Sequence, residues 1–127
     1  MKRRILLVDD HFDSVRPMQL FLEAIGYQVN TAESVEAALR TAMQEKFDLL
    51  VSDIGLPDGS GEDLVRQLRD KGHKLPSIAL SGYGMEQDIK RSRAAGFQVH
   101  LTKPVSPLHL RKSIDQLISQ HGSAPVI

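Results

Sequence analysis

Short apolar runs of strand length alternate along this chain with longer segments of helical period, and this alternation constrains the fold more than any other feature. The first run, Ile5–Val8, is uninterruptedly apolar, which is typical of a strand covered by helices on both faces. Alternating strands and helices favour βα units and a parallel sheet. The sequence therefore predicts an α/β fold.

Five βα units fit in the chain. A domain of 127 residues buries enough apolar surface to fold without a disulfide or a structural metal. We expect a single domain over residues 1–122 and a frayed tail over residues 123–127. The expected strands are Arg4–Val8, Tyr27–Thr31, Phe47–Ser52, Ser77–Ser81 and Phe97–Thr102.

Helix start and stop signals lie between these strands. The fourth helix, Glu86–Ala95, is expected to pack weakly and to be comparatively mobile because its apolar residues are essentially Ile89, Ala94 and Ala95. The signals that bound the helices are Gly26, Ser34, Lys71-Gly72, Gly96 and Ser106-Pro107.

Composition excludes several classes of function. Sixteen basic residues balance 16 acidic ones, so the chain has no overall field to attract nucleic acid or an anionic membrane. The chain contains no cysteine, which rules out a disulfide scaffold and a thiolate metal site. The basic start Met1–Arg4 is followed by an apolar stretch that ends at Asp9, too short for a signal peptide. We therefore expect a cytoplasmic location without membrane contact.

Charged or hydroxyl side chains follow four of the five predicted strands. Asp9 and Asp10 follow the first strand, Asp53 the third, Ser81 the fourth and Lys103 the fifth. In a parallel sheet these ends share the edge where ligands bind. Three carboxylates at that edge repel one another unless they share a cation or take up a proton. We therefore expect a functional site there.

These residue types suit a phosphorylation site. Mg²⁺ prefers a few oxygen ligands and is often held by one or two carboxylates together with a phosphate. A lysine and a hydroxyl would bind the phosphate oxygens. The chain has no Gly-x-x-x-x-Gly-Lys loop to cradle a nucleotide, so the phosphate is expected on the protein itself. Asp53 is the natural nucleophile, and four matching strand ends outweigh the reading that it merely begins a turn.

The set Asp9-Asp10, Asp53 followed by Leu56-Pro57-Asp58-Gly59-Ser60-Gly61, Ser81-Gly82 and Lys103-Pro104 resembles the signature of response regulator receiver domains. The resemblance covers nearly the whole chain. It implies a flavodoxin-like, doubly wound (βα)5 fold with strand order 2-1-3-4-5. It also implies transfer of a phosphoryl group to Asp53 from a histidine kinase or a histidine phosphotransfer protein.

The same resemblance assigns roles to the residues of the site. The domain would catalyse its own phosphorylation and dephosphorylation without being a conventional enzyme. The implied roles are Mg²⁺ binding by Asp10, Asp53 and the Gly55 carbonyl, water-mediated help from Asp9, phosphoryl contacts from Ser81 and Lys103, and a cis peptide between Lys103 and Pro104.

One departure from the family pattern concerns the aromatic side chain that acts as a rotating switch in many receivers. Many receivers carry Tyr or Phe three residues before the lysine, whereas this chain has His100. The sequence around His100 is similar to receivers of hybrid sensor kinases, so we expect a receiver of that kind or a stand-alone relay. The expected output partner is a downstream protein or an attached kinase domain, and the expected state is a monomer or weak dimer. Gly55 and Tyr83 lie where the family tunes the lifetime of the phosphoaspartate, and we group Gly82 with them.

Two other functions remain open. A phosphatase of the haloacid dehalogenase type also uses an aspartate after a buried strand, but it needs a second Asp where this chain has Gly55. A ligand-binding module is the other alternative, because Asp9-x-His11 resembles the start of the cobalamin-binding Asp-x-His-x-x-Gly loop. Ser14 stands at the place of that glycine.

The five histidines do not form a metal-ligand pattern in the sequence. His100 is expected to be a partly buried strand residue, whereas the others are expected at the surface without a metal-ligand partner. No zinc site is predicted. The expected surface histidines are His11, His73, His109 and His121.

Overall fold

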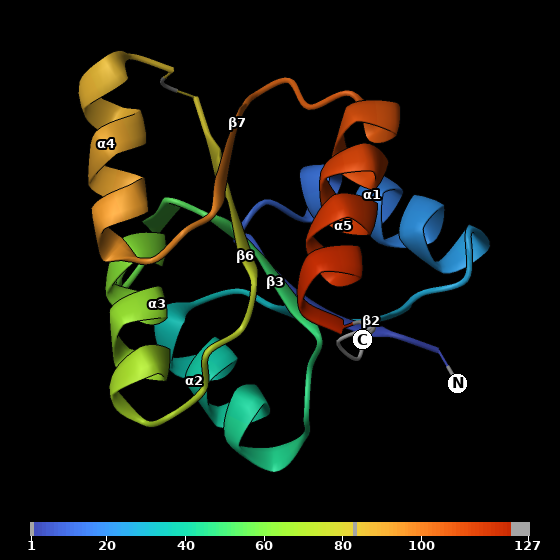
Figure 1. Ribbon diagram of the computed structural model, residues 1–127, viewed down its shortest axis with the longest axis horizontal. Coiled ribbons are helices and arrows are strands. Elements are labelled where there is room, and N and C mark those ends of the chain that lie inside the picture. Colours follow the sequence, from blue (N-terminus) through green and yellow to red (C-terminus); the bar gives the residue numbers. More distant parts are fainter. Residues whose placement is uncertain (1, 83, 123–127) are drawn as a thin grey trace, which may run out of the picture.

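A computed structural model describes residues 2–82 and 84–122, with side chains to residue 120. Five parallel strands of these residues form one sheet in the order β2-β1-β3-β6-β7 (Figure 1). In chain order this is 2-1-3-4-5, so the predicted flavodoxin-like topology is confirmed. The strands are β1 Arg4–Val8, β2 Gln28–Ala32, β3 Leu49–Asp53, β6 Ser77–Ser81 and β7 Val99–Thr102.

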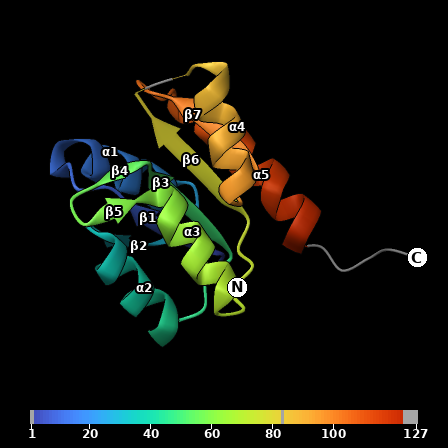
Figure 2. The same ribbon diagram turned by 90° about the vertical axis from the view of Figure 1, so that its left-hand side faces the viewer.

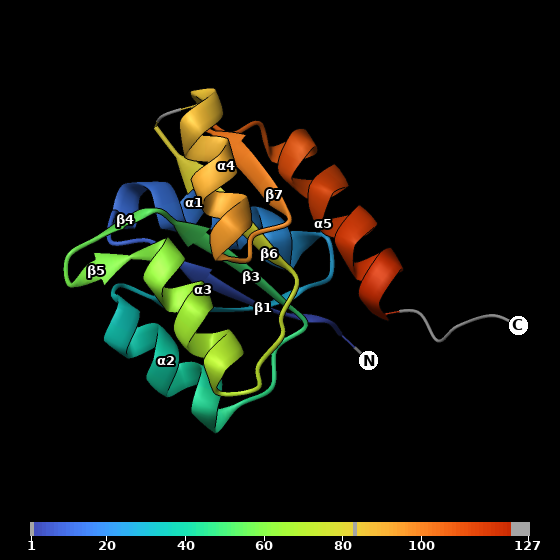
Figure 3. The ribbon, with the colours of Figure 1, turned by 60° about the vertical axis from the view of Figure 1, so that its left-hand side comes forward.

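Helices cover both faces of the sheet, as the doubly wound fold requires. Helices α1 and α5 contact each other on one face, and α3 contacts both α2 and α4 on the other. Figures 2 and 3 show α2, α3 and α4 side by side. The helices are α1 Phe12–Ala24, α2 Val35–Gln44, α3 Gly61–Asp70, α4 Glu86–Ala95 and α5 Pro107–Gly122.

Strand β1, an inner strand of the sheet, shows why its sequence is apolar without interruption. Leu6 and Val8 pack in the core under α2 and α3, whereas Ile5 and Leu7 pack in the core under α1 and α5. All four side chains are fully buried. Burial of each stabilises the fold by about 1.5–3 kcal/mol. This burial on both faces fixes the register of the strand whose end carries Asp9.

The boundaries of three strands differ from the predicted ones. β2 begins and ends one residue later than expected, β3 begins at Leu49 and includes Asp53, and β7 begins at Val99. Phe97 was expected in the last strand, but its backbone N–H donates to the Ser92 carbonyl and closes the end of α4. A hydrogen bond at the end of a helix can therefore keep a residue out of the strand that its apolar pattern predicts.

The segment predicted as a turn after Asp53 contains a small antiparallel hairpin, β4 Gly55–Leu56 with β5 Gly59–Ser60 (Figure 2). Ser60 then caps α3 in a reciprocal capping box with Asp63. Asp58 at the hairpin tip accepts hydrogen bonds from the backbone N–H groups of Val35 (2.8 Å) and Glu36 (3.0 Å). The hairpin is thereby attached to the start of α2.

Helix α4 buries few side chains, in agreement with its apolar-poor sequence. Ala95 is buried, but Ala94, which was expected on the packed face, is exposed. Ser92 lies on that face instead and is fully buried. In the part of the chain that the structure describes, no helix combines the length and hydropathy needed to cross a membrane.

Candidate functional site

Three aspartates meet at the carboxyl edge of the sheet. Strands β1 and β3 are paired neighbours, with Val8 opposite Ser52, so Asp9 and Asp53 follow at the same level. Their side chains are almost fully buried, whereas that of Asp10 is 34% exposed. The carboxylates of all three lie close enough together to hold one ion. We call Asp9, Asp10 and Asp53 the acidic cluster.

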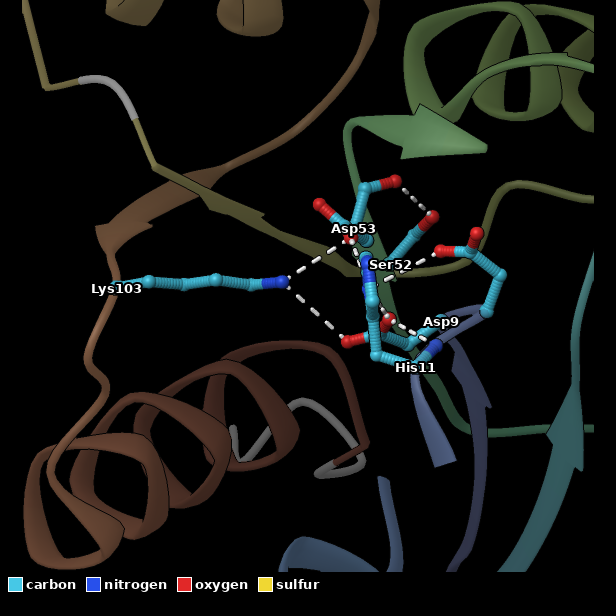
Figure 4. Close-up of polar contacts among 6 residues, drawn as sticks. Asp9, His11, Ser52, Asp53 and Lys103 are labelled. Atoms are coloured by element: carbon cyan, nitrogen blue, oxygen red, sulfur yellow. Dashed lines mark hydrogen bonds and ion pairs between the residues drawn. The ribbon is translucent and has the colours of Figure 1, made fainter. Parts of the chain in front are cut away.

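Lys103 extends across the edge of the sheet to this cluster. Its Nζ lies 3.0 Å from Oδ2 of Asp53 and 3.4 Å from Oδ2 of Asp9 (Figure 4). Partial burial lowers the pKa of Lys103, but its hydrogen bonds and attraction to Asp53 and Asp9 outweigh burial and raise that pKa overall. The side chain is therefore a fixed positive charge. The peptide before Pro104 is cis, as the resemblance implied.

Ser81 ends β6, the strand beside β3. Asp53 pairs with Leu80, so Ser81 lies one residue beyond the level of Asp53 on the neighbouring strand. The backbone N–H of Lys103 donates to the Ser81 carbonyl at 2.7 Å, which holds the ends of β6 and β7 together. A cavity of about 360 Å³ opens beside this end of the sheet, lined by Ile54, Glu62, Ser81, Asp88, Arg91 and His100.

His11 belongs to the site, which the sequence reasoning missed. Its side chain is 64% exposed, as expected, but its Nδ1 lies 3.0 Å from Oδ1 of Asp9, 3.2 Å from Oδ1 of Asp10 and 3.9 Å from Oδ2 of Asp53. The hydrogen bond with Asp9 and the charge of Asp10 raise the pKa of His11. The expectation that it lacks metal-ligand partners was wrong. The available signal was its position directly after Asp9-Asp10.

The described residues that were predicted to tune the site are not part of the acidic cluster. His100 is half-buried on β7, and its Nδ1 lies 3.0 Å from the Ser92 hydroxyl of α4. Gly55 is exposed at the start of β4, and Gly82 is exposed directly after Ser81. Tyr83 lies outside the described residues.

Together, the fold and the site define a class of protein: a doubly wound α/β domain with an acidic pocket and a lysine at the carboxyl edge of its sheet. The response regulator receiver domain family matches residues 5–115, and the chain belongs to this family.

Individual relatives agree with this assignment. The chain is 39% identical over 114 residues to an uncharacterized 14.6 kDa protein of Leptolyngbya boryana, matching 88% of this chain and 87% of that protein. It is 35% identical to the alkaline phosphatase synthesis transcriptional regulatory protein PhoP of Bacillus subtilis, over 93% of this chain but 49% of PhoP. The sensor protein EvgS of Escherichia coli is 28% identical over 98% of this chain and 10% of EvgS. The chain thus spans half or less of these two larger proteins.

Solved structures show the same fold. The crystal structure of a CheY-like response regulator receiver domain protein from Methanospirillum hungatei superposes with a TM-score of 0.90. That match is 29% identical in sequence and covers 96% of this chain and 98% of the other.

Receiver domains generally bind Mg²⁺ at an acidic pocket. The side chains of this site fit such an ion, since carboxylate oxygens are the ligands that Mg²⁺ prefers. The buried carboxylates of Asp9 and Asp53 repel each other, and a bound cation would relieve this repulsion.

Proposed function

We propose that the domain receives a phosphoryl group on Asp53 from a phosphohistidine of a histidine kinase or a histidine phosphotransfer protein, in a reaction that depends on Mg²⁺. The observation that carries this proposal is the Lys103 ammonium, 3.0 Å from Asp53 Oδ2 at the end of a buried strand. Phosphorylation of Asp53 would add negative charge, and the fixed positive charge of Lys103 beside it would stabilise that product.

In the proposed reaction a carboxylate oxygen of Asp53 attacks the phosphorus. A new O–P bond forms, the N–P bond to the donor imidazole breaks, and the nitrogen keeps the electron pair and takes up a proton. Lys103 attracts the phosphoryl oxygens, and the Ser81 hydroxyl donates a hydrogen bond to one of them. Asp10, Asp53 and the Gly55 carbonyl would bind Mg²⁺ directly, with Asp9 acting through water. The ion would neutralise charge on the group in transfer.

The proposed output is a change in protein–protein contacts. A phosphoryl group adds about two negative charges, which favours new contacts with Ser81 and Lys103. The backbone N–H of Lys103 donates to the Ser81 carbonyl, and His100 of β7, the strand that Lys103 follows, contacts Ser92 of α4. Rearrangement of the loop after Ser81 would therefore reach α4 and β7, with Gly55, Gly82 and Tyr83 tuning how long the signal lasts.

The partner class is also a proposal. Similarity to the sensor protein EvgS supports a receiver of the hybrid-kinase type, in which the output partner is an attached kinase domain. A separate downstream protein is the alternative output partner. The domain boundary at residue 122, the monomeric or weakly dimeric state and the cytoplasmic location stay predictions.

The central test is labelling with a small-molecule phosphodonor and Mg²⁺, followed by intact mass measurement. The native chain should gain one phosphoryl group, and Asp53→Asn should gain none. Asp70→Asn is the matched control because Asp70 is an exposed aspartate at the end of α3. Absence of label on the native chain, or label that survives Asp53→Asn, would overturn the assignment.

The alternatives give different results in the same preparation. Sustained turnover of phosphate esters would favour the phosphatase, although the position two residues after Asp53 is Gly55 and supplies no acid. A spectral change on adding cobalamin would favour the ligand-binding module. Phosphotransfer profiling against a panel of kinases would then identify the donor.

A further inference from the structure

The imidazole of His11 faces the acidic cluster (Figure 4). His11 occupies the N-cap position of α1, yet its side chain makes no capping hydrogen bond to the helix. Its backbone N–H donates to Oδ1 of Asp9 at 2.9 Å, which holds the residue beside the carboxylates. The ring is therefore directed to the cluster rather than to the helix end.

The spacing of these atoms fits ligands of a single ion. One ligand atom each from Asp9, Asp10, His11 and Asp53 lies within 4.8 Å of the others. Two ligands that are each about 2.1 Å from an ion lie about 3.0–3.4 Å apart at octahedral or tetrahedral angles. Nδ1 of His11 lies 3.2 Å from Oδ1 of Asp10, a proposed direct ligand, which agrees with that spacing, and 3.9 Å from Oδ2 of Asp53, which lies between the separations of adjacent and opposite ligands.

We propose that Nδ1 of His11 is a direct ligand of the divalent ion and makes this site a mixed oxygen and nitrogen site. The site would then favour late first-row ions such as Co²⁺ over Mg²⁺ by more than carboxylates alone provide. This inference rests on the proposed function only in that both place a divalent ion at the acidic cluster.

The chemistry of the ligands supports a preference of this kind. Carboxylate, carbonyl and water oxygens suit Mg²⁺, whereas imidazole nitrogen suits Fe²⁺, Ni²⁺, Cu²⁺ and Zn²⁺, and affinity rises along the first-row series through Co²⁺. Because the His11 side chain is 64% exposed, it has room to turn away when Mg²⁺ binds. His11 therefore changes the ratio of Co²⁺ affinity to Mg²⁺ affinity, and the carboxylates still bind an ion without it.

The test compares the ratio of Co²⁺ to Mg²⁺ affinity in the untagged full chain by isothermal titration at pH 8. His11→Ala should lower this ratio about tenfold or more. Loss of a group that only orients a metal ligand already lowers metal affinity by about 10–100-fold. His109→Ala is the matched control, since His109 is exposed on α5 and should leave the ratio unchanged. A ratio in His11→Ala equal to that of the native chain overturns the proposal.

A second measurement detects the bond itself and does not depend on a variant that folds. Pulsed electron paramagnetic resonance of Cu²⁺, an ion that imidazole suits, bound at one equivalent to the native chain should show coupling to a directly bonded ¹⁴N nucleus. Absence of that coupling also overturns the proposal. Failure of Asp53 labelling would instead contradict the proposed function, because neither metal measurement involves phosphorylation.

Discussion

The Ser92 hydroxyl lies 3.0 Å from Nδ1 of His100, and this contact joins the buried face of α4 to β7. The same hydroxyl also donates to the Ile89 carbonyl at 3.0 Å. Since a hydroxyl has one proton, it accepts from Nδ1–H of His100 when it donates to Ile89. At the position where many receivers carry Tyr or Phe, this chain thus has a polar contact with α4, a helix that buries only Ser92 and Ala95.

Replacement of Ser92 by alanine tests this contact. Ser92→Ala should lower the free energy of unfolding by about 1 kcal/mol, because a buried hydrogen bond is lost. The amide protons of α4 should exchange faster, since the helix buries few other side chains. Ser113→Ala, which changes a buried serine of α5, is the control and should leave exchange in α4 unaltered. Unchanged exchange in Ser92→Ala would show that the contact does not hold the helix.

Sequence reasoning found the sheet because burial on both faces forces continuous apolar runs, as in Ile5–Val8. It placed Asp53 and Lys103 at one edge because parallel strands end together. It could not find the hairpin after Asp53, whose tip Asp58 hydrogen-bonds to residues 22 and 23 positions away. It also missed His11, because spacing along the chain does not show which way a ring turns at a helix start.

Lys103 should stabilise the chain most when no metal is bound. Lys103→Met leaves buried Asp9 and Asp53 without their shared cation, so the free energy of unfolding should fall by about 1–3 kcal/mol. Mg²⁺ should recover part of this loss and should bind the variant more tightly than the native chain, since a competing positive charge is gone.

Urea denaturation with and without Mg²⁺ measures both effects. Lys112→Met removes an exposed lysine of α5 and serves as the control. Equal losses of stability in the two conditions for Lys103→Met would contradict the shared-cation explanation.

Gly61 allows α3 to begin against the backbone of Asp53. A Cβ at this position would lie 2.5 Å from the Asp53 carbonyl oxygen and 3.0 Å from the Ser52 hydroxyl. Gly61→Ala should therefore destabilise the fold by about 1–3 kcal/mol and weaken Mg²⁺ binding, because the backbone that carries Asp53 must move. Thermal unfolding and metal titration test this. Gly55→Ala, where an added Cβ meets no atom within 4 Å, should keep native stability.

Asp58 should make the attachment of the hairpin to α2 dependent on pH. Hydrogen bonds from the backbone N–H groups of Glu36 and Val35 hold the pKa of Asp58 below its usual value. A carboxyl whose pKa is lower in the folded than in the unfolded chain stabilises the fold above its ordinary pKa of about 4. That contribution is lost as the pH falls through the folded value.

Asp58→Asn removes the charge, so the variant should be less stable than the native chain at pH 7, and the difference should shrink below about pH 4. Urea midpoints measured from pH 7 to pH 3 give this difference directly. Asp70→Asn, at an exposed aspartate, is the control for loss of one charge. A difference between Asp58→Asn and the native chain that stays constant across this range would mean that the ionised carboxylate is not what holds the hairpin to α2.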